Sequence, residues 1–559
     1  MKHTLPLLTA LLIASLASNE SAVAATLTVD ATGHGPDVKL ADPFGDDMVL
    51  QQGMVVPVWG VATPGIKVTV LFAGQSKTTT ADATGNWEVK LDPLTASSTN
   101  RELIVKGGTR ALKVSNVLVG EVWMCSGQSN MEMGVMVTSR TKAESDAEVA
   151  AAKYPEIRLR VCSRVTAPVP QTQVEAGPWR ACSPQSVTYG TQKSGFSSVG
   201  YYFGRDLHRN LHVPVGLIQC AYSGTGIEPW TSAQGVQEVP ELKEENKAIE
   251  IESANYRKAS ADYVAAVEAW TVAAKTRLAK GTLPMPVKPP AMLYSSHIRQ
   301  NTTLYNGMVA PWTRFAVRGV IWYQGEHNAY GDGLLYFDKL RALIGGWRKA
   351  WGKTDAEFPF YIVQLPPFDY ESGPDALPNF WEAQAKAAAR IPNVGMSHSL
   401  DVGSLRSIHP IPKNDVGQRL ARLALSRTYG VKKQSGAPIT DDTGPEFKSL
   451  EVKGSRLVVT FDHAKSGLAA SDGKPLTHFE IAGSDGKFEP AQAEINGNSV
   501  ILTSNQVSTP THVRFACSGL SRPKLKTDIE PPAANLINND KLPASPFRTD
   551  TWQDGTPQP

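Results

Sequence analysis

Residues 116–133 read "NVLVGEVWMCSGQSNMEM". Its first half is almost entirely apolar, whereas Gly127-Gln128-Ser129-Asn130 is small and polar. An apolar run without polar alternation is typical of a strand that is covered on both faces. A strand that ends in this way offers a hydroxyl and backbone N–H groups at one edge of a sheet. The stretch therefore predicts a buried strand followed either by an ordinary turn or by a nucleophile beside an anion site.

Further apolar runs follow, and helical patterns lie between them. The runs are "VPVGLIQC", "VRGVIWY", "FYIVQL" and "VGMSHSL", and the helical segments are "FSSVGYYFGRDLHRNL", "FWEAQAKAAARI" and "DVGQRLARLALSRTYG", the last capped by Asn414. Alternating strands and helices predict an α/β three-layer domain over residues 113–432. Residues 241–300 interrupt it, and apolar side chains at helical spacing there predict a long amphipathic helix that packs on the domain. A Pro-rich stretch, "LPMPVKPP", then leads the chain back.

The two flanks read as β structure. Residues 26–112 contain short runs such as "KVTVLFAG", and residues 436–548 contain the hairpin signal Asn496-Gly497. We expect a sandwich-like β module on each side of the α/β domain, and packing of the two modules on each other is one arrangement.

The first 25 residues have the character of a secretory signal peptide. Lys2 precedes the apolar run "LPLLTALLIASLA", and "SAVAA" supplies small residues for cleavage. No later segment has the roughly 18 uninterrupted apolar residues of a membrane-spanning helix. The sequence therefore predicts a periplasmic or secreted protein that is not inserted in a membrane.

Charge and cysteine content exclude several classes of partner. A formal net charge of +3 with no Lys/Arg run argues against nucleic acid. No CxxC pair or Cys/His spacing suggests a metal, so no cofactor is expected. Cys162 and Cys182 flank a Pro-rich loop, where a disulfide and two free thiols are both open. Cys125 and Cys220 are expected to be buried thiols.

The residues that follow the apolar runs resemble the parts of an acyl-transfer site. Ligands bind beyond the carboxyl ends of the strands in open α/β sheets. One rim should therefore collect the following residues: Ser129, Gly224, Gln324 and His409. Acyl transfer needs a hydroxyl nucleophile, a base that takes its proton, and fixed donors for the tetrahedral oxyanion. Each residue alone has an ordinary structural explanation, and only their joint placement indicates catalysis.

With these residues in this order, the chain resembles the sialate O-acetylesterase-like family of SGNH hydrolases, which are carbohydrate esterases. The resemblance is carried by "DDMVLQQGMVVPVWG", "GEVWMCSGQSNMEM", "FSSVGYYFGRDLH", "SGTGIEPWTS", "LYNGMVAPW", "GVIWYQGEHNA", "SIHPIPKNDVGQRLA" and "LPASPFRTD". It implies a flavodoxin-like SGNH domain in which Ser129 is the nucleophile and His409 the base. It also implies an oxyanion hole made by the Ser129 N–H, the Gly224 N–H and the Gln324 amide.

One position departs from the family pattern. The family commonly has Asp two residues before the catalytic His, whereas this chain has Ser407. The base could be oriented by a backbone carbonyl or the Ser407 hydroxyl, which would give a Ser129–His409 dyad. Alternatively, Asp401 or Glu326 could supply the missing carboxylate. We favour the dyad.

The expected activity is the release of acetate from acetylated sugars, either sialic acids or plant polysaccharides such as xylan and xyloglucan. Aromatic side chains near the rim would suit stacking on sugar faces, although for each one taken alone the core is the favoured position: Trp123, Trp230, Trp322, Tyr222 and Tyr323. The alternatives are a carbohydrate-binding protein with a degenerate esterase domain, and a lipase or thioesterase.

Overall fold

The computed structural model describes residues 38–550, apart from residues 140, 191–193, 283–285, 291, 293–295, 332, 334, 371, 373–374, 435 and 518–533. The predicted signal peptide, residues 1–25, lies outside the described residues. None of the helices in the described ranges combines the length and apolar character needed to cross a bilayer.

One long strand, β8 (Arg110–Gly127), joins the N-terminal β region to the central sheet. Its first part pairs antiparallel with β7 (Ser97–Gly107), and residues 121–127 pair with parallel strand β11 (Val215–Ala221). Gly120 lies where β8 passes from the N-terminal region into the central sheet. The backbone is so close to Pro214 there that a Cβ on Gly120 would lie 1.9 Å from the Pro214 carbonyl oxygen. The domain boundary that the sequence suggested between residues 112 and 113 therefore falls inside a continuous strand.

The central sheet has the order β10-β9-β11-β8-β12-β13-β14. All neighbours on this path are parallel except β10 (Arg180–Cys182), which pairs antiparallel with β9 (Tyr154–Val161). The remaining strands are β12 (Gly319–Tyr323), β13 (Phe360–Val363) and β14 (Val394–Ser397). β8 comes first in the chain but lies inside the sheet, so successive strands are added on both of its sides. This arrangement places a topological switch point, where ligands bind, at the carboxyl end of β8.

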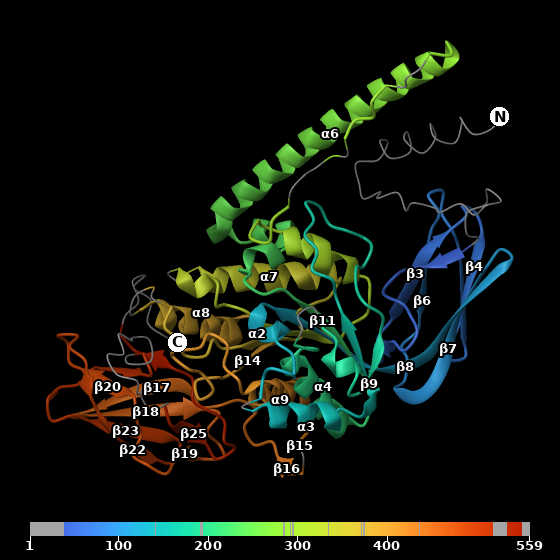
Figure 1. Cartoon of the computed structure of the whole chain (residues 1–559). Helices are drawn as coiled ribbons and strands as arrows, with labels where there is room; N and C mark the ends of the chain where they lie inside the picture. The colour runs from blue at the N-terminus through green and yellow to red at the C-terminus, as the bar shows by residue number, and fades with distance from the viewer. Residues whose placement is uncertain are drawn as a thin grey trace.

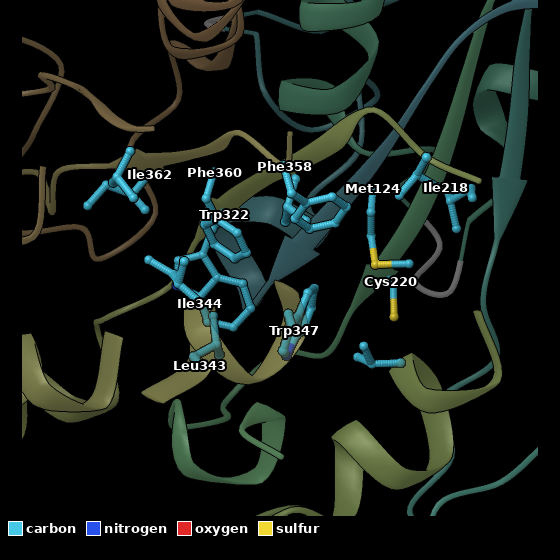
Figure 2. Close-up of a cluster of buried hydrophobic side chains, with 14 of the residues drawn as sticks. Met124, Ile218, Cys220, Trp322, Leu343, Ile344, Trp347, Phe358, Phe360 and Ile362 are labelled. Carbon is cyan, nitrogen blue, oxygen red and sulfur yellow. The ribbon is translucent and has the colours of Figure 1, made fainter. Parts of the chain in front are cut away.

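Alternate residues of the strands form two separate cores. Trp123 and Cys125 face a core shared with α4 (Ser198–Leu211) and α9 (Lys413–Leu423). Met124 and Trp322 face the other core, which Figure 2 shows together with Trp347 of α7 (Tyr336–Ala350). α8 (Ala376–Arg390) contributes to this second core. Burial on both faces explains the unbroken apolar runs and confirms the predicted α/β three-layer class.

The start of α9 differs from the prediction. The N-cap residue is Pro412 rather than Asn414, and the helix begins at Lys413. Proline is well suited to the start of a helix because it has no N–H to leave unsatisfied. The described chain also contains the shorter helices α2 (Ser129–Glu132), α3 (Lys142–Ala151) and α5 (Ala233–Gln237).

Antiparallel sheets flank the central domain. On the N-terminal side, β1 (Val38–Leu40), β3 (Val56–Ala62) and β6 (Asn86–Leu91) form one sheet, while β4 (Lys67–Phe72) pairs with β5 (Gln75–Thr80) and β7. β2 (Val49–Gln51) runs parallel to β8. The C-terminal side has two four-stranded sheets. The first has the order β17 (Glu446–Lys453), β18 (Arg456–Asp462), β23 (Ser499–Thr503) and β22 (Gln492–Asn496). The second has the order β21 (Glu489–Pro490), β20 (Phe479–Ala482), β24 (His512–Phe515) and β26 (Phe547–Arg548). Short pairs are formed by β15 (Lys433–Gln434) with β16 (Ala437–Pro438) and by β19 (Leu468–Ala470) with β25 (Leu536–Asn538).

The two flanking regions lie on opposite sides of the central domain, blue and orange in Figure 1. The suggested packing of the β modules on each other is therefore wrong. Each region instead packs on the α/β domain, the first through the shared strand β8 and the second partly through Arg548, which pairs with Glu382 of α8.

The insertion contains α6 (Lys243–Ala279), a helix of 37 residues that projects away from the body of the molecule (Figure 1). The prediction of a long helix is confirmed, but the prediction that this helix packs on the domain is wrong. Within α6 just Ile249 and Ala274 are buried among the described side chains. The Trp270 indole N–H donates to the carbonyl oxygen of Pro286 at 2.8 Å, so part of the returning Pro-rich segment runs along the helix.

None of the five cysteines forms a disulfide, and all five are buried. A Cys162–Cys182 disulfide is therefore wrong, and strand geometry gives the reason. Cys182 lies opposite Tyr154 at the beginning of β9, whereas Cys162 follows the end of β9. At about 3.3 Å per residue the strand separates them by roughly 20 Å or more, far beyond the reach of a disulfide. Cys125 and Cys220 are buried, as expected.

Candidate active site

Ser129 is the first residue of the short helix α2, immediately beyond the carboxyl end of β8. The turn before it requires glycine. Gly127 has a φ of +139°, and a Cβ there would lie 2.1 Å from the carbonyl oxygen of Tyr323 on β12. The Gln128 N–H donates to that same oxygen at 3.0 Å. The neighbouring strand therefore fixes the turn, and Ser129 is left 8% exposed at the edge of the sheet.

His409 comes from the loop before α9 and reaches Ser129. Its Nε2 lies 2.8 Å from the Ser129 Oγ, across a sequence separation of 280 residues. Burial, followed by the positive charge of Lys413, lowers the pKa of His409 below its usual value. A neutral imidazole at hydrogen-bond distance from a serine hydroxyl has the geometry of a general base.

Neither carboxylate considered from the sequence contacts the His409 ring. Asp401 forms two hydrogen bonds with Arg419, at 2.7 and 2.6 Å. Glu326 is fully buried and accepts a hydrogen bond from the Asn130 amide. The Ser407 hydroxyl bonds the backbone of His409, with 3.1 Å to its carbonyl oxygen and 3.3 Å from its N–H. Of the described residues, none accepts a hydrogen bond from the His409 Nδ1.

Two of the predicted oxyanion donors lie at the same edge. The Ser129 N–H is at the first position of a helix, where no intrahelical acceptor exists. Gly224 lies in the exposed loop after β11 with a φ of +74°. A Cβ at Gly224 would meet nothing within 4 Å, so the backbone conformation rather than space favours glycine there.

Gln324, directly after β12, is fully buried and holds the loops together. Its Nε2 donates to Gln128 Oε1 at 3.1 Å, to the Thr225 carbonyl oxygen at 3.1 Å and to Asn328 Oδ1 at 2.8 Å. Its Oε1 accepts from the Tyr336 hydroxyl at 2.8 Å. The two amide hydrogens thus face three acceptors, and an oxyanion would have to displace one of them.

Glu132, at the end of α2, was not identified from the sequence. It is fully buried and accepts hydrogen bonds from the Ser223 N–H at 2.9 Å and the Ser223 hydroxyl at 2.6 Å. Arg164 pairs with the other carboxylate oxygen at 2.6 Å and lies over the Tyr222 ring. Glu132 therefore ties helix α2, which begins at Ser129, to the Gly224 loop. The stretch "SNMEM" contained this residue, but a Glu in a short helix gives no signal of burial.

Most of the aromatic residues expected near the rim belong to the core. Trp123, Trp230, Trp322 and Tyr323 are fully buried, and only Tyr222 of the set is partly accessible. Tyr330, which ends the loop that begins at Gln324, is 57% exposed and was missed. Within the described ranges no group of three or more His, Cys, Asp or Glu side chains could hold a metal ion.

The comparisons with known proteins cover this domain. Residues 119–285 and 288–426, which include all four predicted site residues, match the family model "Carbohydrate esterase, sialic acid-specific acetylesterase". The sialate O-acetylesterase of Rattus norvegicus is 30% identical over 464 residues, which is 77% of this chain and 80% of that protein. The Mus musculus enzyme of the same name is 29% identical over 463 residues with the same coverage. The crystal structure of a carbohydrate acetylesterase from Xanthomonas citri matches with a TM-score of 0.73 and 32% identity, covering 92% of this chain and 100% of that chain.

Proposed function

We infer that this chain, which belongs to the sialic acid-specific acetylesterase family of carbohydrate esterases and is a carbohydrate O-acetylesterase, releases acetate from acetylated sugars with Ser129 as nucleophile and His409 as base. The observation that carries this assignment of roles is the 2.8 Å distance between Ser129 Oγ and His409 Nε2 at the carboxyl edge of the sheet.

The reaction follows from that pair. Ser129 Oγ attacks the acetyl carbonyl carbon while His409 Nε2 takes the hydroxyl proton. The tetrahedral intermediate collapses, the ester C–O bond breaks, and the imidazolium returns its proton to the departing sugar oxygen. Water then attacks the acetyl-Ser129 ester with His409 again as base, which releases acetate and restores the serine hydroxyl.

The oxyanion would be stabilised by the Ser129 N–H, the Gly224 N–H and the Gln324 amide. The helical start at Ser129 and the exposed glycine loop support the first two donors. For Gln324, rotation of one N–H away from Thr225 or Asn328 would supply the third. The two backbone donors are held in place before the reaction and cost no reorganisation when charge develops, whereas the Gln324 amide must first give up one of its acceptors.

Two substrate classes remain in the proposal, acetylated sialic acids and acetylated plant polysaccharides such as xylan or xyloglucan. The rat and mouse relatives favour the first, and the carbohydrate acetylesterase from Xanthomonas citri, which aligns over almost the whole chain, is consistent with either. Tyr222, in the loop after β11, and Tyr330, after β12, are accessible aromatic side chains that could stack on a sugar ring.

Acetate release from a panel of acetylated sialosides, xylan and xyloglucan tests this proposal, with 4-nitrophenyl acetate and a long-chain 4-nitrophenyl ester in parallel. We expect turnover of the short ester and of one carbohydrate class. Absence of turnover of every ester would instead support a carbohydrate-binding protein with a degenerate site, and preference for the long chain would support a lipase.

Export is a further part of the proposal. The charged start and apolar run of residues 2–25 support a periplasmic or secreted location. Mass determination of the N-terminus of protein recovered from the periplasm or medium should show cleavage near Ala24 or Ala25. Protein that remains in the cytoplasm with residue 2 intact would contradict it.

A further inference from the structure

Lys413 is a fully buried lysine four residues after the proposed base, and the proposed reaction does not use it. Its Nζ donates to the Asn130 Oδ1 at 2.5 Å and lies 5.1 Å from the centre of the Tyr323 ring. Lysine is almost never buried completely unless it is paired. Here the charge of Glu326 faces it, and burial nevertheless lowers the pKa of Lys413 to about 7.

Asn130 connects this cation to the catalytic pair. The residue follows Ser129 directly and is itself fully buried. Its Oδ1 accepts from Lys413, whereas its Nδ2 donates both to Glu326 Oε1 and to the carbonyl oxygen of Ile408, the latter at 2.9 Å. An amide has one acceptor end and one donor end, so a cation on one side and an anion on the other allow a single orientation.

The backbone on both sides of His409 is therefore held by this cluster. The carbonyl of Ile408 immediately before the base is bonded to Asn130, and Lys413 at the beginning of α9 is bonded to the same amide. Ser407 bonds the backbone rather than the ring, and Asp401 is paired with Arg419. Among the described residues, no carboxylate forms a hydrogen bond with the His409 ring and so orients it directly.

We propose that Lys413, acting through Asn130 and balanced by Glu326, is the positioning residue that holds His409 against Ser129 in place of the missing triad acid. The proposal rests on the proposed function in that His409 is the base. Lys413 is fully buried and, in the described structure, bonds to Asn130 rather than to Ser129 or His409, so its effect is on the orientation of His409 and on its charge state.

The electrostatic consequence has a definite sign. The charged group that faces Lys413 in the described structure is Glu326, and the neutral ring of Tyr323 also faces it. His409 is the titrating group on which the charge of Lys413 acts. A positive charge opposes protonation of the imidazole, which is why it lowers the pKa of His409. Removal of that charge should raise the pKa of His409 and move the acidic limb of kcat/KM to higher pH.

The test uses Lys413→Met, which keeps the length of the side chain and removes its charge. Because a single substitution leaves Glu326 as an unpaired buried group, the second variant is Lys413→Met/Glu326→Gln, in which both charges are absent. Lys77→Met is the matched control, since it breaks an ion pair with Asp92 in the N-terminal region. All variants are compared by thermal melting, by kinetics on 4-nitrophenyl acetate, and by the titration of His409 in ¹³C-histidine NMR, assigned with His409→Gln.

We expect both network variants that fold to lose about 100-fold in kcat with little change in KM, the cost of a base displaced by about 1 Å. The His409 titration and the acidic limb should move to higher pH, and Lys77→Met should change neither. A folded network variant with wild-type kcat, or one that loses activity while the His409 titration stays in place, overturns the proposal. If the wild type hydrolyses no acetyl ester, the proposed function fails, and the NMR titration still decides the influence of Lys413 on His409.

Discussion

Asp401→Asn separates a catalytic dyad from a displaced triad. In the structure the Asp401 carboxylate is 33% exposed and pairs with Arg419 rather than with His409. Exposed or partly exposed ion pairs contribute about 0.2–1 kcal/mol, and the two hydrogen bonds here place this pair near 1 kcal/mol. Arg419 also keeps its bond to the carbonyl oxygen of His398, at 2.8 Å. We therefore expect a loss of stability of about 1 kcal/mol at most.

The expected loss in kcat on 4-nitrophenyl acetate is less than about tenfold, because the group removed does not touch the base. A triad carboxylate that is changed to an amide loses about 10⁴ in kcat in a serine protease. The assay is kcat with thermal melting in parallel, and Arg419→Gln is the matched control because it breaks the same ion pair from the other side. A loss of several orders of magnitude in well-folded Asp401→Asn, with Arg419→Gln active, would refute the dyad and show that Asp401 orients His409.

Three other changes probe the site. Gln324→Ala should lower kcat more than it raises KM, because an oxyanion donor acts mainly in the transition state; a rise in KM alone would make Gln324 a structural or substrate-binding residue. Gly127→Ala should destabilise the protein by about 2 kcal/mol or more and impair turnover, since its Cβ would lie 2.1 Å from a backbone oxygen, whereas Gly345→Ala, with open space around it, should not lower the melting temperature. Because the pKa of His409 is lowered and catalysis needs the neutral ring, kcat/KM should be retained as pH falls below about 6.5 and be lost only at lower pH; an acidic limb above that value would contradict the electrostatics of the site.

The sheet and its rim could be predicted because a strand that is buried on both faces has a continuous run of apolar residues. Ser129, Gly224, Gln324 and His409 follow four such runs, and the parallel order of the strands brings their carboxyl ends to one edge. The presence of a core on each face of the sheet could also be predicted, since alternate residues of each strand must face opposite layers.

The misses have a common physical origin in contacts between distant segments. Lys413 is buried because Glu326 and Asn130, about 90 and 280 residues away in the chain, surround it, and its neighbours in sequence carry no trace of this. The pairing of Cys182 with Tyr154 depends on a strand register that spacing cannot show. The apolar positions of α6 predicted a helix correctly, but periodicity does not say what the apolar side contacts.

The proposed reaction requires Ser129 to form an acetyl-enzyme with His409 as its base. The most direct test is the release of acetate by wild-type protein and by Ser129→Ala, together with intact-mass analysis of protein quenched during turnover. Ser129 is a small residue at a strand end, so the substitution should leave the melting temperature unchanged. We expect an acetyl adduct of about 42 Da on Ser129 in the wild type, and neither adduct nor acetate release in the variant. Acetate release near the wild-type rate from folded Ser129→Ala would contradict it.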